Sequence, residues 1–308
     1  MKIPLLVIFG PTSVGKTKVA IALAKRYKGE IVSADSRQVY CEMNIGTDKP
    51  TLEERDGIAH HLIDVVNPDE PFNLSDYVEL AWNVIHDIHQ RGKLPILAGS
   101  AGLYIRAVTE GYALSNAGPD ENLRKQLLQR IETEGTLPLY EELCRLDPEG
   151  AKTLDSKNPR RLIRFYEIYA QTGKMPSEIW KLRDPRAQAF APIKIGLIRS
   201  REKLHERIVA RVDEQEKRGL IFEVKGLLQK YPRDLKAFQT HSYQEVFPFF
   251  DGQYDWDEAK RLIVAHTFAY ARRQWIWFKR EKGVHWEEAE PFGDWGTIAA
   301  RLQKIIKI

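Results

Sequence analysis

Gly10-Pro11-Thr12-Ser13-Val14-Gly15-Lys16-Thr17 is the stretch that decides the fold. It matches the pattern G-x-x-x-x-G-K-S/T. The apolar, β-branched run Ile3–Phe9 before it is typical of a buried parallel strand. Lys16–Tyr27 after it has apolar residues at helical spacing. A glycine-rich turn between a strand and a helix predicts a loop that binds phosphate groups.

The residue types in this loop indicate how it would bind phosphate. Glycines let backbone N–H groups turn inward around phosphate oxygens, and the helix N-terminus adds partial positive charge. Lys16 would neutralise phosphate charge, and the Thr17 hydroxyl could bind Mg²⁺. The loop alone does not say which phosphates are bound, because a nucleoside triphosphate and a prenyl diphosphate present the same groups.

Strands and helices alternate on both sides of the loop. Residues 30–33 and 94–98 read as further strands, and residues 77–90 as a helix that Gly92 ends. Beyond residue 112 helices and turns are expected up to residue 183, the first capped by Asp120 and carrying Leu123, Leu127 and Ile131. Residues 184–192 read as a loop, and residues 193–198 as a strand that returns to the sheet.

These elements predict an α/β fold, a P-loop NTPase-like parallel core with a helical insertion. The core would comprise residues 1–113 and 193–308, and the insertion residues 114–192. Ser200 would start a helix bearing Leu204, Ile208 and Val212. Residues 257–282 would form a long helix whose inward stripe carries Leu262, His266, Ala269, Arg273 and Trp277.

Composition is that of a globular protein, with 43% hydrophobic and 29% charged residues in 308. No stretch approaches the roughly 18 apolar residues of a membrane helix, so no membrane partner is expected. The apolar N-terminus runs into the glycine loop rather than a cleavage site. Two cysteines form no disulfide framework. We therefore expect a cytoplasmic protein, acting as a monomer.

Basic residues gather in two places, although the net charge is only +4. Residues 157–174 hold five Lys or Arg against one acid, and residues 266–282 hold five against one. Two such clusters suit a polyanion, or they are two solvated helix faces. Asp35 is a separate candidate, because it follows the second strand and should lie near the phosphate loop. It could bind Mg²⁺ through water, act as a base, or form a turn.

Several motifs in a fixed order resemble the tRNA dimethylallyltransferases. The family patterns G-P-T-x-x-G-K-T, D-S-x-x-x-Y, I-G-T-x-K-P and H-H-L-I-D correspond to residues 10–17, 35–40, 45–50 and 60–64. Asn158-Pro159-Arg160-Arg161-Leu162-Ile163-Arg164 and Arg273-Gln274 with Trp277-Phe278 also match. The resemblance extends over most of the chain, to about residue 286.

The resemblance implies that a dimethylallyl group passes from dimethylallyl diphosphate to the exocyclic amine of an adenosine beside the anticodon. Mg²⁺ and the loop would hold the diphosphate, with Lys16 and Thr17 as key residues. Asp35 would accept the amine proton from a base flipped out of the anticodon stem-loop. The expected tRNA contacts are Asp35, Ser36, Arg37, Gln38, Arg124, Arg160, Arg161, Leu162, Ile163, Arg164, Gln239, Thr240, His241, Ser242, Tyr243 and Gln244.

Three departures from the family patterns bear on activity. In G-G-T-G-L-Y the threonine is Ala101, so Ser100 is the candidate replacement hydroxyl. Where the family pattern reads G-Y-K/R-E, this chain has Ser242 in place of the glycine and Gln244 in place of the basic residue. Where the pattern reads T-R, Phe268 replaces the arginine. Two alternatives stay open: a small-molecule or nucleotide kinase, which the same loop would serve by binding ATP, and a non-catalytic relative that binds tRNA, which Ala101 suggests.

Overall fold

The computed structural model describes residues 2–112, 118, 120–289 and 295–306. The chain divides into two compact units. Unit 1 comprises Met1–Thr109 with Ala189–Ile308, and unit 2 comprises Glu110–Gln188. The boundary that we expected at residue 114 lies outside the described residues.

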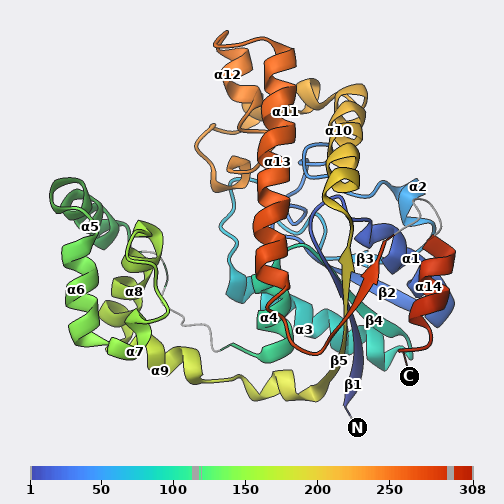
Figure 1. Cartoon of the computed structure of the whole chain (residues 1–308), viewed down its shortest axis with the longest axis horizontal. Coiled ribbons are helices and arrows are strands. Elements are labelled where there is room, and N and C mark those ends of the chain that lie inside the picture. Colours follow the sequence, from blue (N-terminus) through green and yellow to red (C-terminus); the bar gives the residue numbers. More distant parts are fainter. Residues whose placement is uncertain (1, 113–117, 119, 290–294, 307–308) are drawn as a thin grey trace. The chain divides into compact units, whose positions relative to one another are not determined.

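Unit 1 is built on a six-stranded sheet in the order β3-β2-β4-β1-β5-β6, in which every neighbouring pair is parallel (Figure 1). The strands are β1 (Ile3–Phe9), β2 (Gly29–Ala34), β3 (His60–His61), β4 (Leu94–Gly99), β5 (Phe190–Ile198) and β6 (Val284–Glu288). The predicted parallel α/β core is confirmed. The edge strands β3 and β6 were not predicted, because both are short and lack a continuous apolar run.

Helices cover both faces of the sheet. From β1 the chain passes through α1 (Lys16–Tyr27) to β2, in one direction along the sheet. From β3 it passes through α3 (Leu74–Gln90) to β4, in the opposite direction. Right-handed crossovers in opposite directions place their helices on opposite faces. On the α1 side, α14 (Trp295–Leu302) joins the core around Leu6, Ile8 and Leu23. Burying each such side chain contributes roughly 1.5–3 kcal/mol.

β5 begins at Phe190, three residues before the predicted start, so the loop that we expected at residues 184–192 is partly wrong. Its first part is a short 3-10 helix, η1 (Pro185–Ala189), and Pro192 lies within the strand. Pro192 pairs with β1 only, because β6 joins β5 from Lys194 onward. A strand residue that is paired on one side only does not need its N–H group, so the proline is tolerated there.

The long helix α13 (Trp256–Phe278) is confirmed, but the predicted inward stripe is wrong, because its residues precede the buried ones by one position or, at Ala269, by two. The buried residues are Ala259, Ile263, Thr267, Ala271, Gln274 and Phe278. Ala271 packs against Leu204 and Ile208 of α10 (Arg201–Lys217), whereas Phe278 packs against Phe9 of β1. Small and polar residues fill much of this interface, so hydrophobicity did not reveal it. Ser200 caps α10 as predicted, its hydroxyl accepting the N–H of Lys203 at 3.3 Å.

The remaining helices of unit 1 are α2 (Leu52–Arg55), α4 (Gly102–Glu110), α11 (Leu220–Lys230), η2 (Lys236–Phe238) and α12 (Val246–Phe250). Glu110, the last residue of α4, is already assigned to unit 2. Among the described residues, every helix is too short or too polar to span a lipid bilayer.

Unit 2 is helical in its described part. It contains α5 (Glu121–Glu134), α6 (Leu137–Leu146), α7 (Pro148–Ala151), α8 (Pro159–Thr172) and α9 (Pro176–Lys181). Asp120 caps α5 as predicted, its carboxylate accepting the N–H of Leu123 at 3.0 Å. Leu143, Leu162 and Phe165 are fully or almost fully buried and form the centre of one apolar cluster.

Candidate active site

The phosphate loop joins β1 to α1 at the carboxyl edge of the sheet. Gly10 and Gly15 have φ angles of 155° and 109°, which L side chains rarely adopt. A Cβ atom at Gly10 would also lie 2.5 Å from the carbonyl oxygen of Leu197. Only glycine therefore fits at the start of the loop, and Lys16 then begins α1 with its N-terminal N–H groups next to the loop.

Cations converge on this loop from two helices. The Lys16 ammonium donates to the carbonyl of Pro11 at 2.7 Å. From α10, Arg207 donates to the carbonyl of Ser13 at 2.6 Å. Arg211 donates to the hydroxyls of Thr12 at 2.8 Å and Ser13 at 3.4 Å. The sequence signal for these arginines, two basic residues one turn apart on a helix that follows a core strand, was overlooked.

Burial makes this positive charge costly. Desolvation lowers the pKa of Lys16 to about 7, with Asp35 opposing that effect. Desolvation likewise lowers the pKa of Arg207 to about 10. Burial disfavours the charged form of such a group, and a bound ligand of opposite charge would stabilise it again. The loop and its cations are therefore arranged for an anionic ligand.

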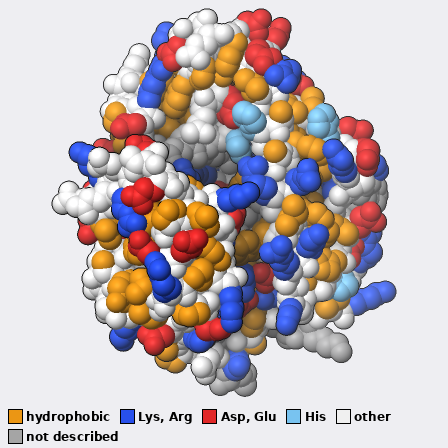
Figure 2. Space-filling view, turned by 60° about the vertical axis from the view of Figure 1, so that its left-hand side comes forward, with side chains coloured by type: hydrophobic (Ala, Val, Ile, Leu, Met, Phe, Trp, Pro, Cys, Tyr) orange, Lys and Arg blue, Asp and Glu red, His pale blue; other side chains and the backbone are white. Residues whose placement is uncertain are grey.

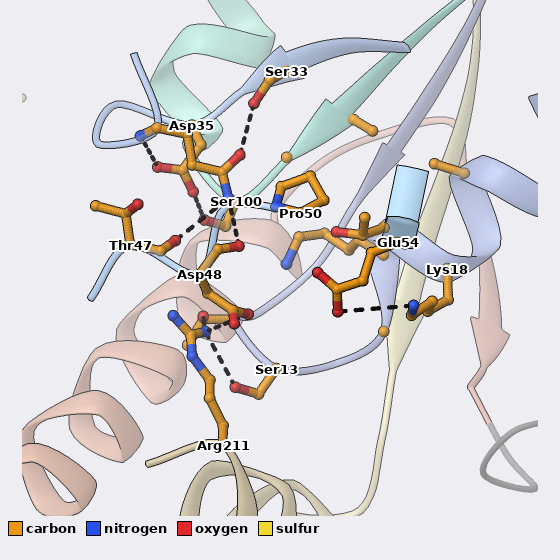
Figure 3. Close-up of a pocket in the computed structure, with 18 of the residues that line it drawn as sticks. Ser13, Lys18, Ser33, Asp35, Thr47, Asp48, Pro50, Glu54, Ser100 and Arg211 are labelled. Carbon is orange, nitrogen blue, oxygen red and sulfur yellow. Dashed lines mark hydrogen bonds and ion pairs between the residues drawn. The ribbon is translucent and has the colours of Figure 1, made fainter. Parts of the chain in front are cut away.

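Asp35 faces the loop from the adjacent part of the sheet edge. It follows β2, and Ser100 follows β4, which pairs directly with β2. One Asp35 carboxylate oxygen accepts the N–H groups of Arg37 at 2.9 Å and Gln38 at 3.4 Å. The other accepts the hydroxyl of Ser100 at 3.2 Å (Figure 3). Asp35 thus forms the turn that we considered, and it keeps an oxygen directed toward Ser100.

Asp35 and Ser100 line one cavity of about 810 Å³. Figure 3 shows Asp35 and Ser100 together, with Asp48, Arg211 and Ser13 farther along the same pocket. Asp48 lies 3.5 Å from Arg211. The cavity is also lined by Thr17, Glu53 and Glu54. It is large enough for a small diphosphate ligand together with part of a second substrate.

Gln274 connects the phosphate loop with the segment after β4. Its side-chain oxygen accepts the Thr12 N–H at 2.8 Å, and its amide nitrogen donates to the Ser100 carbonyl at 3.1 Å. The sequence located Gln274 only as part of a motif and gave it no role. These two hydrogen bonds explain how a polar residue can occupy a buried position of α13.

Arg37 connects the Asp35 turn with the segment of residues 239–244. Its guanidinium donates to the carbonyls of Lys236 at 2.7 Å and Gln239 at 2.9 Å. Gln38 turns the other way, donating to the carbonyl of Asp48 at 3.1 Å and accepting the Ser33 hydroxyl at 3.1 Å. The side chains of both residues thus have partners within the protein.

The segment of residues 239–244 exposes only part of its predicted contact set. Gln239 and Gln244 are exposed and Thr240 and His241 are half-buried, whereas Ser242 and Tyr243 are buried. Ser242 has a φ of 75°, which suits the glycine that the family pattern has there.

The Tyr243 hydroxyl donates to Glu223 at 2.7 Å. Glu223 also accepts the N–H groups of Asn44, Ile45 and Gly46 at 2.7–3.0 Å. Tyr243 therefore holds the I-G-T motif through Glu223 and is not itself on the surface.

In unit 2 the predicted contact residues lie in three different environments. Leu162 and Ile163 are buried in the apolar core of the unit, so only their backbone could contact RNA. Arg124 and Arg164 pair with the fully buried Glu167, at 2.6 and 3.3 Å. Arg160 and Arg161, at the start of α8, are exposed.

Comparison with known proteins gives a consistent result. A family model described as IPP transferase matches residues 38–281. The tRNA dimethylallyltransferase of Halothermothrix orenii is 41% identical over 302 residues, covering 98% of this chain and 92% of the relative. That of Geobacillus thermodenitrificans is 43% identical over 282 residues, covering 92% of this chain and 89% of the relative.

Solved structures agree with these relatives. The tRNA isopentenylpyrophosphate transferase of Bacillus halodurans is 37% identical with a TM-score of 0.71, covering 98% of both chains. A eukaryotic dimethylallyltransferase acting on tRNA is 29% identical with a TM-score of 0.79, covering 98% of this chain and 77% of that one.

Proposed function

The chain belongs to the family of tRNA dimethylallyltransferases, and we propose that it prenylates the exocyclic N6 amine of the adenosine adjacent to the anticodon on its 3′ side. It is a transferase, with dimethylallyl diphosphate as donor and tRNA as acceptor. One observation carries the assignment of roles: Asp35 and the phosphate loop line the same cavity.

In the proposed reaction the adenine nitrogen attacks the first carbon of the dimethylallyl group. An N–C bond forms, the C–O bond to the diphosphate breaks, and its electron pair leaves on the diphosphate oxygen. The amine proton passes to Asp35, whose carboxylate is fixed by the Arg37 N–H and the Ser100 hydroxyl. Ser100 would act as a positioning residue for Asp35. The family pattern has a threonine at the next position, where this chain has Ala101.

Leaving-group charge would develop at the phosphate loop. The N–H groups of the loop and Lys16 would stabilise it, together with Arg207 and Arg211. Hard oxygen donors lie nearby, because Thr17, Glu53 and Glu54 line this cavity, and such donors suit Mg²⁺. Thr17 would be the protein ligand, and Mg²⁺ when bound would add positive charge beside the leaving group.

The acceptor is proposed to be the anticodon stem-loop, bound by a chain that acts as a monomer in the cytoplasm. The exposed Arg160 and Arg161 would contact phosphates, and so would the partly exposed Arg124 and Arg164. Gln239, Thr240, His241 and Gln244 would contact the loop nucleotides through their accessible side chains.

The test is the transfer of a labelled dimethylallyl group to unmodified tRNA with Mg²⁺, with ATP consumption followed in parallel. We expect label in the adenosine next to the anticodon and no ATP use. Asp35→Asn should cut turnover about 10²–10⁴-fold with tRNA affinity nearly unchanged, since it removes a general base. Asp56→Asn, at an exposed surface aspartate, is the matched control. Equal turnover of the wild type and Asp35→Asn would refute the base assignment.

A further inference from the structure

Two histidines and a glutamate meet at the junction of the 239–244 segment with α13. Glu245 directly follows that segment, His241 lies within it, and His266 lies on α13. His266 Nδ1 lies 2.7 Å and His241 Nδ1 3.4 Å from the same Glu245 oxygen, Oε1. The three potential ligand atoms lie within 4.8 Å of one another. None of the three takes part in the chemical step proposed above, although the accessible part of His241 is among the proposed tRNA contacts.

The donor set and its spacing suit a transition metal. Imidazole nitrogen with carboxylate oxygen is a common donor set for Zn²⁺, at about 2.0–2.2 Å from the ion. In a tetrahedral site such ligands lie about 3.4 Å from one another. The His241–Glu245 separation already has this value. His266, now 2.7 Å from the Glu245 oxygen, would have to move outward by roughly 0.7 Å to reach this separation, which its half-exposed side chain permits.

The surroundings orient the ligands and leave a path for an ion. The second Glu245 oxygen, Oε2, accepts the Ser242 N–H at 2.8 Å, which leaves Oε1 directed at the histidines. The His241 ring packs against Tyr270 with ring centroids 5.5 Å apart. Glu245 is only 5% exposed, whereas the histidines are 28% and 51% exposed. Such outer contacts fix the first ligands of metal sites. Figure 2 shows that histidine side chains are exposed on one face of the molecule.

We propose that His241, Glu245 and His266 bind one divalent transition metal ion, with Zn²⁺ as the best fit. Three protein ligands would leave the fourth position to water. The ion would tie the 239–244 segment to α13. Arg37 holds the start of the same segment through Gln239, so the ion would fasten the other end of a segment that adjoins the Asp35 turn.

The test is the binding of Zn²⁺ alone to the metal-stripped full-length chain, by calorimetry at neutral pH without tRNA or diphosphate. We expect one ion per chain with high affinity. His241→Ala and His266→Ala should each weaken binding at least about 10-fold, because the loss of a ligand should cost no less than the roughly 10–100-fold that follows from losing an outer contact to one. His205→Ala and His285→Ala are the matched controls, since both histidines lie outside the cluster. The readout does not depend on the proposed reaction.

A second measurement guards against a variant that misfolds. Co²⁺ bound to the wild type should show the intense visible absorption of a tetrahedral site, and Zn²⁺ should raise the Tm of the wild type but not of His266→Ala. Zn²⁺ binding equal in the wild type and in the His241→Ala/His266→Ala double variant would overturn the proposal. So would no stoichiometric binding to the wild type. The cluster would then be a carboxylate hydrogen-bonded to two imidazoles.

Discussion

The phosphate loop of unit 1 and the Glu167 cluster of unit 2 both gather cations, but they balance the charge differently. Around the loop, Lys16, Arg207 and Arg211 direct their donors at backbone carbonyls and hydroxyls, with Asp48 beside Arg211. In unit 2, Glu167 is fully buried and is neutralised by Arg124 and Arg164. The first arrangement requires an external anion, whereas the second supplies its own. The two arginines of unit 2 therefore stabilise a buried carboxylate in addition to their proposed contacts with tRNA, whereas those beside the loop are proposed to bind the diphosphate.

The largest expected effect tests the requirement for an external anion. Lys16→Met should reduce dimethylallyl transfer about 10²–10³-fold, since it removes a charge beside the developing leaving group. Turnover of tRNA with saturating dimethylallyl diphosphate measures it. Lys25→Met is the matched control, because Lys25 lies on the same helix but outside the cavity, where it pairs with the exposed Asp56. A Lys16→Met enzyme within about threefold of the wild type would remove Lys16 from the mechanism.

Glu30 in unit 1 is also a carboxylate neutralised by neighbouring basic side chains, and its contribution to stability should depend on pH. Hydrogen bonds from Arg91 lead the causes that hold the pKa of Glu30 well below its usual range, with Lys93 and His61 adding to them. Stabilisation from a depressed carboxylate pKa is present above the unfolded-state pKa of about 4.3 and is lost as pH falls below it. Glu30→Gln should therefore lower the free energy of unfolding by about 2 kcal/mol at pH 7.

The pH series decides the cause of that effect. Urea unfolding of the wild type and Glu30→Gln should give curves that converge as pH falls from 5 toward 3. A difference that is constant across this range would mean that packing, not charge, makes Glu30 important.

In unit 2 the expected loss is smaller, because both arginines keep contact with solvent. Glu167→Gln should lower the free energy of unfolding by about 1–2 kcal/mol, after allowance for screening of the 39% exposed Arg124 and Arg164. Urea unfolding followed by fluorescence measures it. Glu132→Gln, at an exposed position on α5, should leave stability within about 0.5 kcal/mol of the wild type. If Glu167→Gln left the free energy of unfolding unchanged, the buried carboxylate would contribute little to stability.

The smallest effect concerns the exposed arginines of the same unit. Arg160→Ala should weaken tRNA binding a few-fold and lower the slope of log affinity against log salt by about 1, as expected for one lost phosphate contact. Filter binding across a salt series measures this slope. Arg145→Ala, at an exposed arginine on α6, is the control. An unchanged slope would assign Arg160 to the solvated surface of α8.

Local sequence patterns determined the central part of the fold. The apolar run of β1, the glycine loop and α1 lie where the sequence predicted them, because each depends on neighbouring residues only. The cap at Asp120 and the helix start at Ser200 were predicted for the same reason. The inward face of α13 was not, since it is set by the small residues that meet α10.

The site divides in the same way. The sequence alone identified Lys16, Thr17 and Asp35, because each stands in a motif or just after a predicted strand. Only the tertiary structure brought in Arg207, Arg211 and Gln274, which are 190 or more residues from the loop that they contact. The same holds for Glu245 and His266, which lie 21 residues apart. Sequence spacing records chemistry within one element, whereas contacts between distant elements depend on how the helices pack on the sheet.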